Sequence, residues 1–437
     1  MQTSFYLKAF PCREKPGYLL LFSTKQASKV FLKEETFKAI EQGTLSPSDE
    51  ALLSKLGMIV HDREEEKQTV FGLLDKINTN NRVLEIMVVL NMDCNFSCIY
   101  CYEGDMKGKL YMSDDTAKRL IDFIKGKFIK DKQSLILHFY GGEPLLSLER
   151  IKSISRELKS FTEKKGGSFY FTITTNGSLF KRPAAKELVF LGLRSVKITL
   201  DGIAETHNKS RPFKSGAPSF DTIIGNIKET CDLTRVGIGG NFDKENYEKF
   251  VSLLDYLEKE GLTSEKISMV KFDPVMKQPL GGAMPSGYAS GCMSINEPWL
   301  SKASAILREE ILKKGYKTLT LLPMPCMVEV SASFVVNFDG FIYKCPAFVG
   351  KKDFAVGSLL TGITDYSSFY KLGIWKNQGC AECLYLPLCF GGCKYMTFIR
   401  DGRVDALDCK KAYLDTSLET MIMQDIKYNL MVDRHFC

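Results

Sequence analysis

Three cysteines, Cys94, Cys98 and Cys101, lie within eight residues of one another in the sequence CNFSCIYC. Three thiolates on one short loop can hold three corners of a cubane iron–sulfur cluster. The fourth iron then has no protein ligand on that loop, and an open coordination position distinguishes a reactive metal site from a structural one. A zinc loop and three unrelated buried cysteines are the plainer interpretations of the same run.

The composition indicates a multidomain protein of a reducing compartment. A length of 437 residues, 44% of them hydrophobic, predicts two or three packed domains. The net charge of +7 is spread along the chain without a dense Lys/Arg block, so we expect no nucleic-acid partner. No apolar run approaches the roughly 18 residues of a membrane helix, and the first residues lack a secretory pattern. We therefore expect a soluble, cytoplasmic protein without a membrane partner.

The cysteine content also indicates metal binding. Ten of the 14 cysteines fall into two groups with ligand-like spacing. Clustered cysteines in a reducing compartment favour metal sites over disulfides. We therefore expect a protein that is sensitive to oxygen.

Residues 1–80 are predicted to form a small separate module. Strands are expected near 5–9 and 18–22, a third strand at 58–60, and short helices before Gly43 and Gly57. The charged sequence HDREEEKQ that follows is interpreted as a linker. Strands and short helices in about 80 residues predict a winged-helix-like module, and a purely structural cap is the alternative.

From about residue 84, apolar strand-like runs alternate with helical patterns. Strand–helix alternation implies parallel strands joined by crossovers, so six units predict a partial (β/α)6 barrel of the TIM type over residues 81–310. Barrel enzymes place their chemistry at the carboxyl ends of the strands. The first strand leads into the three-cysteine loop. The six runs are LEIMVVL, LILHFY, FYFTITT, SVKITL, RVGIGGNF and KISMVKF.

Other strand ends carry unusual residues. LILHFY runs into Gly141, Gly142 and Glu143, where two glycines let the backbone approach a ligand and Glu143 offers a carboxylate. FYFTITT ends in the turn pair Asn-Gly, and SVKITL ends in TLDG, which begins at Thr199. Arg211 follows in HNKSRPF.

Together with CNFSCIYC, these motifs resemble those of the radical S-adenosylmethionine (SAM) enzymes. The resemblance implies a [4Fe-4S] cluster on Cys94, Cys98 and Cys101 whose open iron chelates SAM, and reductive cleavage of SAM to a 5′-deoxyadenosyl radical. It further implies that the GGEP run holds the SAM amino group and that Tyr100 lies near adenine. Thr199, which stands where the family has Ser, and Arg211 would contact the SAM carboxylate.

A second cysteine group lies near the carboxy terminus. Residues 311–437 resemble the SPASM extension of radical SAM enzymes that modify peptides. The resemblance implies two auxiliary [4Fe-4S] clusters, one on Cys326, Cys345 and Cys393, and another on Cys380, Cys383, Cys389 and Cys409. Zinc is the alternative for part of the second set. The fourth ligand of the first cluster stays open between Cys292, Cys437 and an open iron.

The combined resemblance implies a radical SAM maturase of ribosomally made peptides. The amino-terminal module resembles a leader-peptide recognition element, which adds the leader as a strand to its sheet edge. The expected partners are a precursor peptide and an electron donor such as a flavodoxin or ferredoxin, and the expected product is a thioether or carbon–carbon cross-link. One alternative is an anaerobic sulfatase-maturating enzyme, in which an Asp follows the cysteine equivalent to Cys345; here it is Pro346. A non-catalytic iron–sulfur redox carrier is the other.

Overall fold

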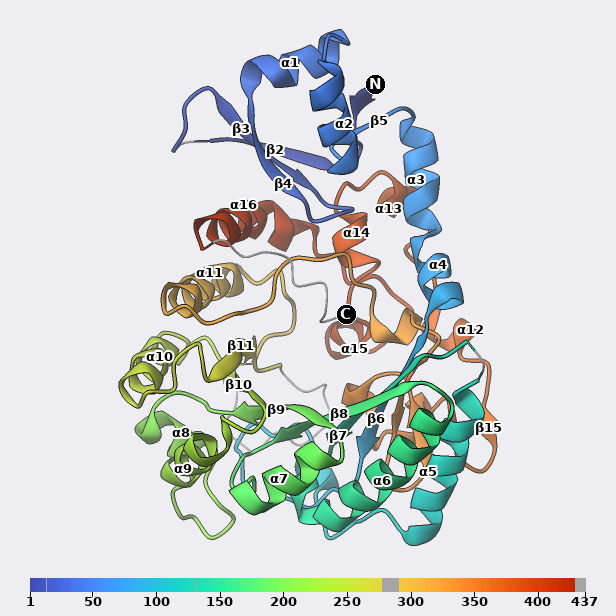
Figure 1. Ribbon diagram of the computed structural model, residues 1–437, viewed down its shortest axis with the longest axis vertical. Helices are drawn as coiled ribbons and strands as arrows, with labels where there is room; N and C mark the ends of the chain where they lie inside the picture. Colours follow the sequence, from blue (N-terminus) through green and yellow to red (C-terminus); the bar gives the residue numbers. More distant parts are fainter. Residues whose placement is uncertain (13, 130, 277–290, 429–437) are drawn as a thin grey trace.

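The computed structural model describes residues 1–12, 14–129, 131–276 and 291–428 (Figure 1). Within these ranges no helix is both long and apolar enough to cross a membrane. The amino-terminal module lies at one end of the long axis of the molecule and the barrel at the other, with elements of the cysteine-rich region between them and beside the barrel (Figure 1).

The barrel is built on six parallel strands in sequential order, as predicted. Each strand pairs in parallel with its neighbours in the order β11-β10-β9-β8-β7-β6. Strands β6, β7 and β8 are buried at nearly every second residue, which is the pattern of a sheet with helices on one face. The strands are β6 (Val83–Val89), β7 (Ser134–Tyr140), β8 (Ser168–Thr175), β9 (Leu193–Thr199), β10 (Arg235–Phe242) and β11 (Ile267–Pro274).

Helices between the strands cover the outside of this sheet (Figure 1). In α5 the Ser113 side chain caps the first turn by accepting from the Thr116 N–H at 3.0 Å, and the helix buries Ala117, Leu120, Ile121 and Ile124 on one face. The helices are α5 (Asp114–Lys127), α6 (Leu148–Lys164), α7 (Arg182–Phe190), α8 (Ala204–Ser210), α9 (Phe220–Thr230), α10 (Lys249–Lys259) and α11 (Pro298–Lys313).

The sheet of the barrel continues into the cysteine-rich region. Strand β12 (Ser333–Val336) pairs in parallel with β6, and three antiparallel strands follow it in the same ten-stranded sheet. These are β13 (Phe341–Tyr343), β14 (Gly357–Ser358) and β15 (Gly362–Ile363). Five helices carry or flank the carboxy-terminal cysteine loops: α12 (Ser367–Tyr370), α13 (Gln378–Ala381), α14 (Leu386–Cys389), α15 (Lys394–Asp401) and α16 (Lys411–Lys427). The domain boundaries at residues 80 and 310 stay predictions.

The amino-terminal module contains the predicted strand pair and two predicted helices. Its antiparallel sheet has the order β2-β3-β4. Helix α1 ends at Gly43, which has a φ of 67° that suits glycine. The elements are β2 (Leu7–Pro11), β3 (Tyr18–Ser23), β4 (Lys29–Lys33), α1 (Glu34–Gln42) and α2 (Pro47–Lys55).

The predicted strand at 58–60 is present as β5 (Ile59–Val60), which pairs with β1 (Gln2–Thr3) in a separate two-stranded sheet, whereas β4 was not predicted. The prediction of a linker was wrong. The sequence HDREEEKQ belongs largely to helix α3 (Arg63–Phe71), which precedes α4 (Leu73–Asn80). Asp62 caps α3, and the buried Glu66 accepts hydrogen bonds from Ser4 and the Phe5 N–H.

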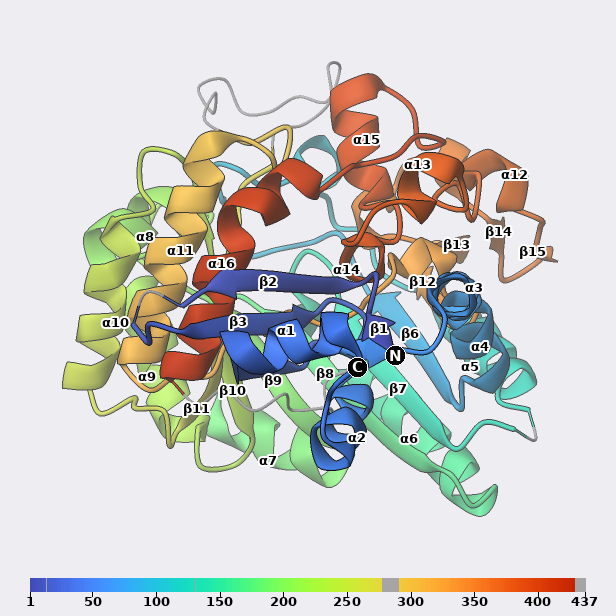
Figure 2. The same ribbon diagram turned by 90° about the horizontal axis from the view of Figure 1, so that it is seen from above.

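The module packs directly on the cysteine-rich region. One face of its sheet buries Phe10, Leu20 and Phe22 against α16 and Tyr385, and Figure 2 shows β2 and β3 lying across α16. The hydroxyl of Thr24 donates to the carbonyl of Leu384, between two of the predicted ligands. The position of the module is therefore tied to the second cysteine group.

Candidate active site

The three-cysteine loop leaves the carboxyl end of β6 and packs against the glycines that follow β7. The Gly142 N–H donates to the Asn91 carbonyl at 3.0 Å, and the Glu143 N–H donates to the Asp93 carbonyl at 2.7 Å. A Cβ on Gly141 or Gly142 would clash with the backbone of Asn91 or Asp93. The glycines, which we predicted to approach a ligand, thus allow the loop to dock on the neighbouring strand end.

The thiols of Cys94, Cys98 and Cys101 share one charged neighbour, Lys107. All three are free thiols. Burial lowers the pKa of the Lys107 ammonium, but Cys101, Cys98 and Cys94 outweigh this effect and raise it overall. Burial raises the pKa of Cys94 to about 12. A cluster would therefore have to stabilise the thiolates that it binds.

Glu143 is fully buried behind this loop and is held by neutral donors. Its Oε1 accepts from the Leu145 N–H at 3.0 Å and from the Thr175 hydroxyl at 2.7 Å, and its Oε2 accepts from the Asn176 N–H at 2.8 Å. Burial raises the pKa of this carboxyl, and the three hydrogen bonds oppose that shift. The carboxylate thus lies in a fixed position beside the cysteine loop.

Tyr100 joins a buried polar network that links three strand ends. Its hydroxyl donates to the carboxylate of Asp201 and accepts from Arg211 at 2.6 Å and from Asn241 at 3.1 Å. The Asn241 N–H also donates to Asp201 at 2.8 Å. Burial raises the pKa of Asp201, while the Arg211 guanidinium opposes the shift. The network brings Tyr100 and Arg211 together, and their contacts with SAM stay predictions.

Sequence reasoning missed Asp201 and Asn241 as parts of this site. Asp201 lies in the TLDG run, of which only Thr199 was singled out, and Thr199 ends β9 and is half-buried. Asn241 lies in β10 with no motif around it. The glycine before it could have been a signal, because a Cβ on Gly240 would clash with Leu200.

His207, to which we assigned no chemistry, is a buried structural residue. Its Nδ1 accepts from the Asp201 N–H at 3.1 Å, and its Nε2 lies 3.1 Å from the Ser219 hydroxyl. Burial and the nearby Arg211 lower its pKa to about 3. The neutral ring therefore holds the segment between Asp201 and Arg211 in place.

The carboxy-terminal cysteines lie in two sets. In the first set, burial raises the pKa of Cys345, and the neighbouring Cys326 and Cys393 raise it further. Burial likewise raises the pKa of Cys393, with a contribution from Cys326. These three thiols, the first cysteine set, are the three that the resemblance groups together.

The second cysteine set comprises Cys380, Cys383, Cys389 and Cys409. Burial raises the pKa of Cys380, and Cys383 and Cys409 add to the shift. Burial also raises the pKa of Cys389, and Cys380 adds to that shift. All four line a cavity of about 300 Å³, together with residues that include Lys8 of β2. The structure thus brings this set together beneath the amino-terminal module.

Two of the remaining cysteines were candidates for the fourth ligand of the first cluster. Cys292 is 2% exposed in an apolar cluster with Phe242, Phe250 and Leu300, and Cys437 lies outside the described residues. In the part of the chain that the structure describes, no three Cys, His, Asp or Glu side chains are arranged to hold a single metal ion. A cubane cluster binds each thiolate through a different iron, so it needs thiols spread around a larger centre.

Comparisons with known proteins agree with this architecture. Residues 88–257 match the family model of the radical SAM superfamily. Fe-coproporphyrin III synthase of Methanosarcina barkeri is 32% identical over 180 residues, which cover 40% of this chain and 41% of that protein. The chain thus spans less than half of that relative. A cysteine-type anaerobic sulfatase-maturating enzyme of Clostridium novyi is 24% identical over 335 residues, 69% of this chain and 85% of that enzyme.

Two solved structures share the fold. anSMEcpe with bound AdoMet and Kp18Cys peptide matches with a TM-score of 0.61 at 16% identity, over 80% of this chain and 100% of that chain. SuiB of Streptococcus suis bound to the precursor peptide SuiA matches with a TM-score of 0.52 at 17% identity, over 93% of this chain and 98% of that chain. Residues 88–257 thus match a radical SAM domain, a fold that implies SAM and a [4Fe-4S] cluster as cofactors, and most of the chain shares the fold of these two solved structures.

Proposed function

We propose that this chain is a maturase that binds a ribosomally made precursor peptide and cross-links it, by a thioether or a carbon–carbon bond. The observation that carries the proposal is the meeting of the Cys94, Cys98 and Cys101 thiols beside buried Glu143 and the Tyr100–Arg211 pair. When bound, the loop cluster and SAM supply a carbon radical that abstracts a hydrogen atom from the peptide. The residues of the chain position these groups and exclude water.

The polar groups at the strand ends fit SAM. The buried guanidinium of Arg211 has an Nε without a hydrogen-bond partner among the described residues, so it can donate to the SAM carboxylate. A carboxylate offers about four acceptor positions, and three of those of Glu143 are in use. One position is left for the SAM ammonium, and the Thr199 hydroxyl would donate to the carboxylate.

The two carboxy-terminal cysteine sets fit two auxiliary [4Fe-4S] clusters. The four thiols of the second set line a cavity that is far larger than one zinc ion needs, which supports a cluster there. The first set has three thiols, and Cys292 is buried in another apolar cluster. The fourth position stays open between Cys292, Cys437 and an open iron. A flavodoxin or ferredoxin would supply the electrons.

The edge strand β4 is the proposed binding site for the leader of the precursor. The Ser23 N–H donates to Ser28 and the Glu34 N–H donates to Gly17, so the backbone groups of Lys29, Phe31 and Lys33 point away from β3. An extended peptide can pair with such an edge. The opposite edge, β2, carries Pro11, which blocks pairing.

The two alternatives have less support. The relative from Clostridium novyi favours a sulfatase-maturating enzyme, but the residue after Cys345 is Pro346, which cannot act as a base. A non-catalytic carrier would have no use for a buried Arg211 with a free donor.

The proposal is tested with reduced, reconstituted protein, SAM and the short peptides encoded beside this chain. We expect 5′-deoxyadenosine together with a peptide that has lost two hydrogen atoms per cross-link, measured by mass spectrometry. Formylglycine in the product would favour the sulfatase-maturating alternative. No 5′-deoxyadenosine with any of the peptides would reject the maturase.

A further inference from the structure

We propose that Asp408 is a positioning residue that lowers the reduction potential of the cluster held by the first cysteine set. This inference rests on the proposed function, because it requires the auxiliary cluster to be present. It names a residue outside the cysteine ligands and assigns to it one measurable property of that cluster.

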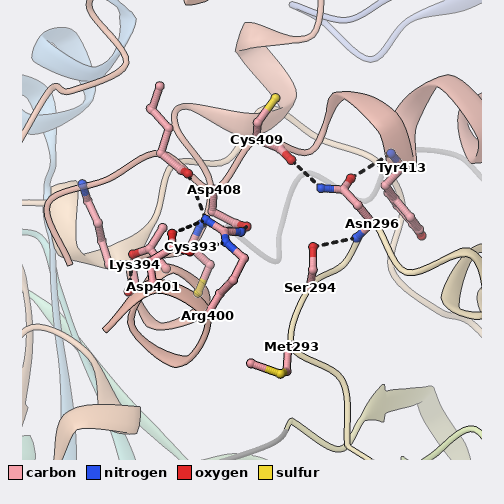
Figure 3. A network of polar contacts seen from close by, with 12 residues as sticks. Met293, Ser294, Asn296, Cys393, Lys394, Arg400, Asp401, Asp408, Cys409 and Tyr413 are labelled. Atoms are coloured by element: carbon pink, nitrogen blue, oxygen red, sulfur yellow. Dashed lines mark hydrogen bonds and ion pairs between the residues drawn. The ribbon is translucent and has the colours of Figure 1, made fainter. Parts of the chain in front are cut away.

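The carboxylate of Asp408 lies against the last cysteine of the first set. The Asp408 side chain is buried, with 1% of its surface exposed. Its Oδ2 accepts from the Cys393 N–H at 3.1 Å, and its Oδ1 accepts from the Arg400 guanidinium at 3.2 Å (Figure 3). Both its charge and its hydrogen bond therefore reach the first set.

The backbone holds Asp408 tightly in this position. The Asp408 N–H donates to the Gly391 carbonyl at 2.9 Å. Gly392 has a φ of 78°, and a Cβ there would clash with the backbone of Asp408. Segment 391–393 and segment 408–409 are thus packed backbone to backbone, so the carboxylate cannot move away from Cys393 easily.

The next residue, Cys409, belongs to the second set and is fixed from the other side. Its carbonyl accepts from the Asn296 side chain at 2.7 Å, and Asn296 in turn accepts from the Tyr413 N–H at 3.0 Å (Figure 3). Asp408 therefore lies between the two cysteine sets. The charge of Asp408 acts on the first set, while the next residue, Cys409, belongs to the second set.

Two physical effects of Asp408 lower the potential. A buried negative charge beside the cluster disfavours the addition of an electron, because little water is present to screen it. Hydrogen bonds to cluster and ligand sulfurs are one of the levers that set these potentials, and Asp408 occupies the N–H of Cys393. Arg400 offsets part of the charge. The Lys344 and Lys394 side chains interact with Cys326 as well, although burial lowers the pKa of both ammonium groups.

The test compares three variants of the full-length, reconstituted protein: Asp408→Asn, Arg400→Gln and Asp401→Asn. Asp401 is the matched control, because it also pairs with Arg400, at 2.7 Å, but its side chain is 35% exposed. Iron content is measured first, and the potential of each cluster is then titrated with dithionite and followed by electron paramagnetic resonance.

We expect the potential of the first-set cluster to rise in Asp408→Asn, to fall in Arg400→Gln and to stay unchanged in Asp401→Asn. A purely structural role would change iron content without opposite shifts. If Asp408→Asn loses iron, the Arg400→Gln variant decides the test. An unchanged or raised reduction potential of the first-set cluster in Arg400→Gln overturns the inference. Equal potentials in all variants at wild-type iron content also overturn it, without touching the proposed function. Wild-type protein without auxiliary iron would overturn both.

Discussion

The hydroxyl of Tyr100 donates a hydrogen bond to the buried carboxylate of Asp201, which connects the cysteine loop to the end of β9. Arg211 donates to the same hydroxyl at 2.6 Å. The Tyr100 phenol therefore lies between the Asp201 carboxylate and the Arg211 guanidinium, whose opposite charges would otherwise attract each other directly. This arrangement holds the Arg211 guanidinium near the cysteine loop and keeps its Nε free.

We expect Tyr100→Phe to weaken SAM binding without loss of the loop cluster. A hydrogen bond to a charged group contributes roughly 1.5–3 kcal/mol, so the dissociation constant should rise by about 10-fold to 150-fold. Anaerobic equilibrium dialysis measures it. The control Tyr102→Phe removes a hydroxyl from the same loop, where it donates to Tyr140 at 3.0 Å. An equal loss of affinity in both variants would contradict the assignment.

Gly142→Ala should destabilise the docking of the cysteine loop, since its Cβ would clash with the Asp93 backbone. Overpacking of this kind costs roughly 1–3 kcal/mol, which chemical unfolding can measure. Gly225→Ala in α9 is the control, because a Cβ there meets open space; it should be neutral or slightly stabilising. If both variants are as stable as wild type, the docking contact is unimportant.

His207 predicts a pH dependence of stability. Its pKa of about 3 in the folded protein lies below the ordinary value near 6.5, so the unfolded chain binds a proton more readily between these values. Stability from this group is complete above about pH 6.5 and falls as the pH drops, by at most about 1.4 kcal/mol per pH unit. Thermal unfolding between pH 5 and 7 should be less pH-dependent in His207→Gln. The exposed His61→Gln variant should behave as wild type, and an identical slope in all three proteins would refute this role.

The proposed leader site on the edge of β4 predicts that a proline in this strand weakens binding of the leader peptide. Lys33 has a φ of −62°, which proline adopts without strain. Lys33→Pro removes an outward N–H and should weaken binding of the leader peptide, measured by fluorescence anisotropy, while SAM cleavage is retained. Lys33→Gln shows how much of the loss of leader binding comes from removing the Lys33 charge. Ala9→Pro on the β2 edge is the matched control for proline. Stronger loss in Ala9→Pro than in Lys33→Pro would place the leader elsewhere.

The barrel could be predicted from sequence because its signals are local. Each strand is a short apolar run, and α5 and α6 show the helical period directly. The pairing of β12 with β6 joins residues about 250 positions apart, and no local pattern reports such a contact. The helix α3 was missed for the same reason, because Glu66 is buried by partners at Ser4 and Phe5.

The candidate site could be predicted only in part. Cysteine spacing and the GGEP run identified residues that the fold does bring together. The partners that hold them, Asp201 and Asn241, act through hydrogen bonds between distant strand ends. Asp201 lies in the TLDG run and Asn241 follows a glycine, but neither signal says which distant side chain each residue contacts.

The most direct test of the account is the iron and labile sulfide content after anaerobic reconstitution. It should be measured on the intact protein and on the variant in which Cys94, Cys98 and Cys101 are all replaced by Ala. The account predicts about 12 irons per chain falling to about 8, which corresponds to three four-iron clusters, one of them on the loop. About four irons falling to none, with zinc bound in their place, would contradict the auxiliary clusters.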